Sequence, residues 1–432
     1  MSSELQRVRW LTIPLVCLLT AAFVGCPPAD VPRPVEEPAV EGPMVEEPIE
    51  EPAAEGPAAE EPVAEEPAVE GPMVEEPIEE PAAEPATEEV GITTDPKGPM
   101  AQAELLIELP PKYNSPDGMC LLPNGDVIVS VPNVNDRSFP AVLLRVKPDN
   151  TYEELMKSPL HPETGKAFPF GVATDEKGDL YLADLQWFAN PEDPGHNSRV
   201  LWIPMEDGKP GEPKSIIEGL VVANGVLIRN GHIYVTDTTM KPGTKPLVTG
   251  VFRFRLEEAK KETIRVTQPP EDDPHCIGTF LTHNLDVGFG ADGVTMDNEG
   301  NLYVSDFADG VLYKIEFEED GTPKPPALFA KAPFMKSADG IFFDPKREVI
   351  FVADSLANAV QMVFLDGTVR TLAQDPENDG SGGRLDQPSE TLVRGDELIV
   401  CNFDFPVPGG VNTKFDPPHT ISVIKLPESL RD

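Results

Sequence analysis

The sequence of 432 residues is poor in cysteine, histidine and basic residues, and each shortage excludes a class of protein. Its 5 cysteines have no regular spacing, so they give neither a disulfide framework nor a cysteine-rich metal site. The 6 histidines form no motif with a serine or cysteine nucleophile, and nothing indicates a covalent hydrolase. Because 75 acidic residues outnumber 34 basic ones, we expect no nucleic-acid partner.

Long apolar runs are also scarce, and the one that stands out lies at the N-terminus. Residues 10–24 are apolar, follow two arginines and are too few to span a bilayer comfortably, which predicts an export signal over residues 1–25. The signal ends in Phe-Val-Gly-Cys, which resembles a bacterial lipobox. The resemblance implies a lipid on Cys26 and, with Pro27 next, a lipoprotein of the outer membrane in the bacterial cell envelope. An ordinary signal or an uncleaved anchor is the alternative.

Aromatic residues are absent from residues 26–99, where proline recurs at about every fourth or fifth position. The string EEPAVEGPMVEEPIEEPAAE begins at Glu36 and again at Glu65. Residues 27–89 hold 21 acidic residues and 1 arginine, which is about half of the net charge of −41. Such a segment cannot form a core, and proline with like-charge repulsion predicts an extended, disordered linker.

The remaining residues, 100–432, repeat one phrase six times. Each copy has a short polar or other variable residue, usually a glycine, an apolar run, a polar turn and a second apolar run. The copies begin at Asp117, Phe170, Asn224, Asp292, Asp339 and Ser389. Two strand-like runs at roughly 50-residue spacing predict an all-β, six-bladed β-propeller. We expect Ala103–Leu109 to supply the last strand of blade six and thereby to close the ring.

A propeller places the first residue of every copy around its central axis. Asp117, Asn224 and Asp292 would then present hard oxygen ligands of the kind that Ca²⁺ or Mg²⁺ takes. Carboxylates that face one another need a cation or a proton between them. With no histidine or cysteine in the ring, Ca²⁺ is favoured over Zn²⁺. The alternative is that Asp-Gly and Asn-Gly are only good turn dipeptides.

Polar residues also end the second apolar run of the later copies, at the same mouth of the propeller. We expect them to cap loops through hydrogen bonds to the backbone: Asp184, Asp237, Asp306, Asp354 and Asn402. The longest connections are predicted at this mouth too, at residues 186–199, 238–250, 267–291, 374–388 and 403–419. Long loops at one end of a rigid scaffold predict a binding surface there.

Two segments resemble a known family. VVANGVLIRNGHIYVTDT, around Asn224, and GADGVTMDNEGNLYVSDF, around Asp292, are similar to motifs of the gluconolactonase, senescence marker protein and luciferin-regenerating enzyme family. The resemblance covers residues 103–426 and implies a six-bladed propeller that hydrolyses a sugar or aliphatic lactone with one divalent cation. It implies Asn224 and Asp292 as metal ligands, Asp292 also as the catalytic acid or base, and Asp117 in place of the family's first-blade glutamate.

This chain departs from the family at Asp117, which is one methylene shorter than glutamate, and at Phe170, where relatives have an asparagine beside the substrate. Glu390 follows the sixth ring position, and we expect its carboxylate to point into the shaft and compensate. The residues predicted to border the substrate are Phe170, Asp339, Ser389 and Glu390.

Two other functions stay open. The segment IFVADSLANAVQMVFLDG is also similar to non-catalytic NHL repeats, which would make the domain a binding propeller. A strictosidine-synthase-like or streptogramin-lyase-like propeller is the third possibility. In each case we expect a monomer that takes a small-molecule ligand and meets the membrane only through a lipid on Cys26.

Overall fold

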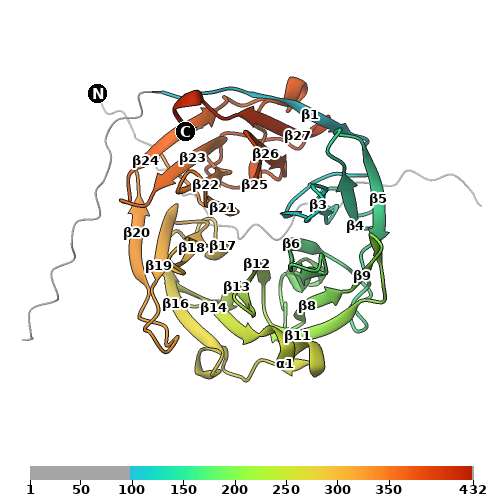
Figure 1. The fold of residues 1–432 in the computed structure, drawn as a ribbon, viewed down its shortest axis with the longest axis vertical. Coiled ribbons are helices and arrows are strands. Elements are labelled where there is room, and N and C mark those ends of the chain that lie inside the picture. The colour runs from blue at the N-terminus through green and yellow to red at the C-terminus, as the bar shows by residue number, and fades with distance from the viewer. Residues whose placement is uncertain (1–97, 431–432) are drawn as a thin grey trace, which may run out of the picture. The chain divides into compact units, whose positions relative to one another are not determined.

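The computed structural model describes residues 98–430, which form a nearly all-β domain with its blades arranged around a central axis (Figure 1). The predicted export signal and the predicted lipid on Cys26 lie outside these residues. The predicted linker, residues 26–99, also lies outside them, except for residues 98 and 99. Within residues 98–430 no helix has the length and apolar character needed to cross a membrane.

Blades one to three are antiparallel sheets whose inner hairpins are the first three copies of the repeat. Blade one holds β2 (Met119–Leu121), β3 (Val127–Val131), β4 (Val142–Val146) and β5 (Tyr152–Lys157). Blade two holds β6 (Pro169–Thr174), β7 (Leu180–Asp184), β8 (Ser198–Ile203) and β11 (Lys214–Leu220), with β15 (Ile264–Arg265) added in parallel at its edge. Blade three holds β12 (Ala223–Arg229), β13 (His232–Lys241), β14 (Leu247–Arg255) and β16 (Cys276–Thr282).

Blades four to six follow the same order from the axis outwards. Blade four holds β17 (Ala291–Met296), β18 (Leu302–Asp306), β19 (Val311–Ile315) and β20 (Ala327–Lys331). Blade five holds β21 (Ile341–Asp344), β22 (Val349–Asp354), β23 (Ala359–Phe364) and β24 (Val369–Gln374). Blade six holds β25 (Pro388–Arg394), β26 (Glu397–Asn402), β27 (His419–Lys425) and β1 (Ala103–Leu109).

The other described elements are short. They are the hairpin of β9 (Met205–Glu206) and β10 (Lys209–Pro210), the helix α1 (Leu256–Lys261), and the 3₁₀ turns η1 (Gln186–Ala189), η2 (Pro270–Asp272), η3 (Ser381–Gly383) and η4 (Glu428–Leu430). The six-bladed all-β fold predicted from the repeat is confirmed.

The ring closes as the sequence predicts. β1 pairs antiparallel with β27, from Ala103 opposite Ile424 to Leu109 opposite His419, and Figure 1 shows the two strands side by side at the outer edge of blade six. The apolar residues Ile107 and Leu109 of β1 are buried. The first and last described strands therefore complete one sheet, and blade six does not end in a three-stranded sheet with β27 at its edge.

Two of the predicted long loops, residues 267–291 and 238–250, are wrong. Residues 276–282 form β16, the outer strand of blade three, because this segment alternates buried and exposed side chains as an outer strand does. The connection predicted at residues 238–250 is shorter, since β13 runs to Lys241 and β14 begins at Leu247. The core lies between neighbouring blades; Val129 of blade one, for example, belongs to the same buried cluster as Ile399 of blade six.

The glycines of the repeat are explained by close approach at the axis. A Cβ atom on Gly171 would lie 2.2 Å from the Asn224 carbonyl oxygen, and one on Gly225 would lie 2.3 Å from that of Asp292. Blades one, four and five show the same contact with the next blade. Neither Gly171 nor Gly225 has a positive φ angle. Glycine is thus required because the inner strands nearly touch, and the interpretation as simple turn dipeptides is wrong.

Candidate functional site

The axis opens at one mouth into a cavity of about 80 Å³. Its lining combines a few polar side chains with many apolar ones, as the lining of small-molecule sites does. Five of the six predicted ring residues line the cavity: Asp117, Phe170, Asn224, Asp292 and Asp339. The inner strands bring them together because each blade presents the start of its first strand to the same mouth.

The wall of the cavity is strongly apolar. It includes six phenylalanines, Phe170, Phe188, Phe289, Phe307, Phe403 and Phe405, together with Leu185, Val222 and Val407. Phe170 stacks on Phe188 with ring centroids 5.6 Å apart and lies 5.8 Å from the ring of Phe403. Several of these residues come from the connections predicted to roof this mouth, which therefore supply a hydrophobic wall.

The floor of the cavity carries oxygen donors. Asp117 and Asp292 are 8 % and 6 % exposed. Asp339 Oδ2 accepts a hydrogen bond from the Ser355 hydroxyl at 2.9 Å. Among the residues that the structure describes, no hydrogen bond engages the carboxamide of Asn224, which leaves its oxygen free to bind a ligand.

Burial and mutual repulsion make these carboxyl groups harder to ionise. Burial raises the pKa of Asp117 to about 7, although hydrogen bonds from Gly118 and Ser389 oppose the shift. Burial, and then the negative charges of Asp117 and Glu390, raise the pKa of Asp292 well above its usual range. Repulsion of this kind is relieved by a proton or by a cation.

The donor set fits an oxygen-ligated divalent cation, because carboxylate and carboxamide oxygens are ligands that Ca²⁺ takes. Asp117 and Asp292 would supply carboxylates, and Asn224 would supply a carboxamide oxygen. Within residues 98–430, the one group of three acidic, histidine or cysteine side chains whose ligand atoms lie within 4.8 Å of one another belongs to blade six.

Two residues predicted to border the substrate lie elsewhere. Ser389 and Glu390 do not line the mouth cavity. The Ser389 hydroxyl donates to the Pro116 carbonyl oxygen at 3.2 Å. Glu390 stands one residue further into the shaft, where the other copies have glycine, and it lines a second cavity beyond the ring. Its Oε1 atom accepts a hydrogen bond from the Thr391 amide at 2.8 Å, so the expected compensation for the shorter Asp117 is only electrostatic.

The outer circle of polar residues caps loops, as predicted. Asp237 accepts hydrogen bonds from the amides of Val221 and Val222 at 2.9 and 2.8 Å. Asp354 likewise accepts from Lys336 and Ser337, at 3.1 and 2.9 Å. These carboxylates hold the loops of the mouth in place and do not line the cavity.

The sequence analysis missed the polar residues of the upper wall. Thr238, Ser355 and Gln387 line the cavity, and the buried atoms Thr238 Oγ1 and Gln387 Oε1 have no hydrogen-bond partner. A signal was present, because the residue directly after each cap of blades two to six lines the cavity. These residues are Leu185, Thr238, Phe307, Ser355 and Phe403.

Comparison with known proteins finds similarity among solved structures. No family model and no curated protein matches this chain. Among solved structures, a luciferin-regenerating enzyme is 11 % identical, with a TM-score of 0.48, over 76 % of this chain and 95 % of that chain. A gluconolactonase from Xanthomonas campestris is 16 % identical, with a TM-score of 0.45, over 80 % of this chain and 99 % of its own. Regucalcin from Agrobacterium tumefaciens, a calcium-binding protein, is 12 % identical, with a TM-score of 0.47, over 76 % and 94 %.

This chain is a six-bladed propeller, as its own sheets show. At such identities and TM-scores the likeness says nothing of the chemistry at the axis. The architecture itself stands on the strand pairings described above, and any function must be argued from the cavity.

Proposed function

We propose that the domain is a metal-dependent hydrolase that opens a lactone bearing an apolar chain or ring. One observation carries this proposal: the oxygen donors Asp117, Asn224 and Asp292 form the floor of a cavity whose wall is made of phenylalanines. The floor suits a polarised ester group, and the wall suits the apolar remainder of the substrate.

The residues of the floor divide the work of ester hydrolysis. A divalent cation held by Asp117, Asn224 and Asp292 would polarise the lactone carbonyl as a Lewis acid. Asp292, whose pKa is raised by burial and by neighbouring carboxylates, accepts a proton from the attacking water. The water oxygen bonds to the carbonyl carbon, the bond from that carbon to the ring oxygen breaks, and the proton passes to the departing alkoxide. The product is a hydroxy acid.

The wall favours an aliphatic substrate over a sugar. A sugar lactone carries several hydroxyl groups, and each one buried without a partner costs free energy. The side chains of Phe170, Phe188 and Phe403 have no hydrogen-bonding group for such hydroxyls. The unpartnered Thr238 Oγ1 and Gln387 Oε1 can serve one or two polar groups of a substrate, which fits the ester end of an aliphatic lactone.

A panel of lactones tests this function. We expect full-length protein to hydrolyse aliphatic γ- and δ-lactones, with kcat/KM rising as the alkyl chain lengthens, because each buried methylene contributes about 0.8 kcal/mol. Gluconolactone is the matched polar substrate and should be opened more slowly. Chelation should abolish the reaction and Ca²⁺ should restore it. Release of acid, followed with a pH indicator, is the measurement, and hydrolysis unaffected by chelation would contradict the proposal.

A binding propeller is the second candidate, and Phe170 is the observation that favours it. An apolar ring stands where the resemblance implies an asparagine beside the substrate, and it stacks on Phe188. A domain that binds an apolar ligand without turnover would need this wall but no base. Saturable binding of an aliphatic lactone that stays intact in the presence of Ca²⁺ would favour this function.

We also propose that the domain is exported and anchored to the bacterial outer membrane through a lipid on Cys26. The basic and apolar start of the chain and its Phe-Val-Gly-Cys ending support this. Cys26→Ser is expected to prevent lipidation and to release the protein from the membrane fraction. A variant that stays fully in that fraction would show that Cys26 is not the anchor.

A further inference from the structure

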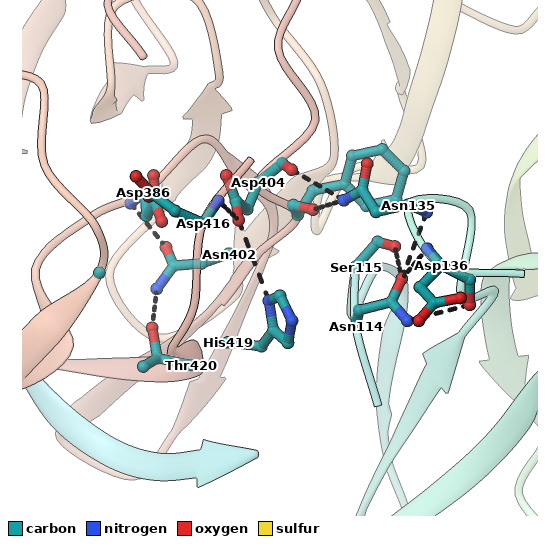
Figure 2. Close-up of polar contacts among 12 residues, drawn as sticks. Asn114, Ser115, Asn135, Asp136, Asp386, Asn402, Asp404, Asp416, His419 and Thr420 are labelled. Carbon is teal, nitrogen blue, oxygen red and sulfur yellow. Dashed lines mark hydrogen bonds and ion pairs between the residues drawn. The ribbon is translucent and has the colours of Figure 1, made fainter. Parts of the chain in front are cut away.

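Three aspartates of blade six form a separate acidic cluster (Figure 2). Asp386 lies just before β25, Asp404 just after β26, and Asp416 shortly before β27. One carboxylate oxygen from each lies within 4.8 Å of the other two. Asp386 and Asp404 are 1 % and 2 % exposed, so two of the three carboxyl groups are withdrawn from water.

Hydrogen bonds satisfy this cluster only in part. Asn412 Nδ2 donates to Asp386 Oδ1, and the Asp416 amide donates to Asp404 Oδ2 at 3.1 Å. Asp404 Oδ1 is buried and has no hydrogen-bond partner. Among residues 98–430, no lysine or arginine forms an ion pair with any of the three aspartates. A buried carboxylate oxygen without a donor is costly, and here it points to a missing ligand.

The neighbouring histidine does not satisfy the cluster. His419 is 4 % exposed, and its Nδ1 atom lies 3.9 Å from Asp404 Oδ2, too far for a hydrogen bond. Nδ1 has no other hydrogen-bond partner either. The atoms Asp404 Oδ1 and His419 Nδ1 are thus buried without a hydrogen-bond partner on two side chains that lie close together (Figure 2).

Further oxygens lie near Asp386. Asp386 Oδ2, Thr420 Oγ1 and the Pro418 carbonyl oxygen lie 3.1, 3.2 and 3.3 Å from the point that a Cβ atom would occupy on Gly380. A hydroxyl and a carbonyl oxygen thus lie beside Gly380 together with the Asp386 carboxylate. Asn402 fixes this arrangement, since its Oδ1 accepts from the Asp386 amide and its Nδ2 donates to Thr420 Oγ1.

We propose that Asp386, Asp404 and Asp416 bind a second divalent cation of the size of Ca²⁺. Ca²⁺ takes oxygen ligands at about 2.3–2.6 Å, so two ligands of one ion lie up to about 5 Å apart, which matches the spacing of the cluster. Mg²⁺ requires distances of about 2.0–2.1 Å and so a tighter cluster. The ion would compensate the negative charges of three neighbouring carboxylates, two of which are buried.

The position of this site gives the ion a structural task. Asp404 and Asp416 lie near the two ends of the β26–β27 connection, and Asp386 lies on the neighbouring segment before β25. An ion shared by all three would fasten both ends of the connection to the body of blade six. The same connection carries Phe403, Phe405 and Val407, which line the mouth cavity. The second ion would therefore hold part of the hydrophobic wall in place.

Tryptic cleavage after Lys414 tests this proposal on the full-length protein. Lys414 is exposed within the β26–β27 connection, so cleavage there reports its opening. At a free Ca²⁺ concentration ten times the dissociation constant, cleavage should slow about tenfold, because only the ion-free form opens. Asp416→Asn and Asp404→Asn should remove this protection. Asp416 is partly exposed, so its variant is expected to fold even if the Asp404 variant does not.

Two controls separate this site from its surroundings. Asp379→Asn removes an exposed carboxylate that pairs with Arg384 in the connection between β24 and β25, and it should keep the protection. Asp292→Asn, at the axis, should keep it as well, so the two proposed sites fail independently. Equilibrium dialysis in low free Ca²⁺ should count one bound ion fewer for Asp416→Asn than for Asp379→Asn. Equal protection and equal ion counts in these two variants would overturn the proposal.

Discussion

Asp292→Asn is expected to lower kcat for lactone hydrolysis about 10²–10⁴-fold while the domain stays folded. Asparagine keeps the shape of the side chain and one oxygen ligand, but it cannot accept a proton from water. Burial, and then repulsion with Asp117 and Glu390, raise the pKa of Asp292, and a neutral amide removes both costs, so the variant should be no less stable than the original. Initial rates and a thermal melt of the same sample are the two measurements.

Asp366→Asn is the matched control, because it makes the same chemical change on an exposed turn between β23 and β24. Its kcat should equal that of the unaltered protein. If Asp292→Asn hydrolyses lactones at the same rate as Asp366→Asn, Asp292 is not the base. A low rate accompanied by a collapsed melting transition would instead show a structural role for Asp292.

Removing β1 is expected to destabilise the propeller severely. A version that begins at Pro110 loses the whole of β1, including the buried residues Ile107 and Leu109. Burying two such side chains contributes about 3–6 kcal/mol, a large share of a typical folding free energy of about 5–15 kcal/mol. The deletion also leaves β27 as an unpaired edge. We expect Tm to fall by about 10 °C or more, or the protein to aggregate.

A version that begins at Gly98 is the control for this deletion. It keeps β1 and the hydrogen bonds that the Met100 and Ala101 amides donate to the Leu372 carbonyl oxygen. It should melt as the full-length protein does, because the predicted linker is rich in proline and glutamate, has no aromatic residue and cannot build a core. Similar melting of the versions beginning at Gly98 and Pro110 would mean that β1 does not hold the ring closed.

The architecture could be predicted because its information is local. One copy of the repeat forms one inner hairpin, so the ring residues Asp117, Asn224 and Asp292 could be placed around the axis from spacing alone. Closure by residues 103–109 followed from blade six lacking a strand. The caps, such as Asp237, could be assigned because an aspartate at the end of a strand commonly accepts hydrogen bonds from backbone amides of a nearby loop.

The wall of the cavity could not be predicted in the same way. Phe188 and Phe289 lie in connections without periodicity, and only the folded loops turn them toward the axis. Asp386, Asp404 and Asp416 are spread over two connections, and nothing in their spacing resembles a metal-binding motif. They meet because β25, β26 and β27 are neighbours in one sheet. Glu390 was misplaced for a simpler reason, since one residue along the strand moves a side chain to another level of the shaft.

The close approach of the inner strands also limits how the shaft can be redesigned. Five of the six inner strands carry glycine after the ring residue, and in each a Cβ atom would overlap its neighbour; only blade six carries a side chain there, Glu390. In a library that varies all six positions, most variants are expected to misfold. Diversity at this level of the shaft is open at one position, so a new ligand or charge for the second cavity is best introduced at residue 390.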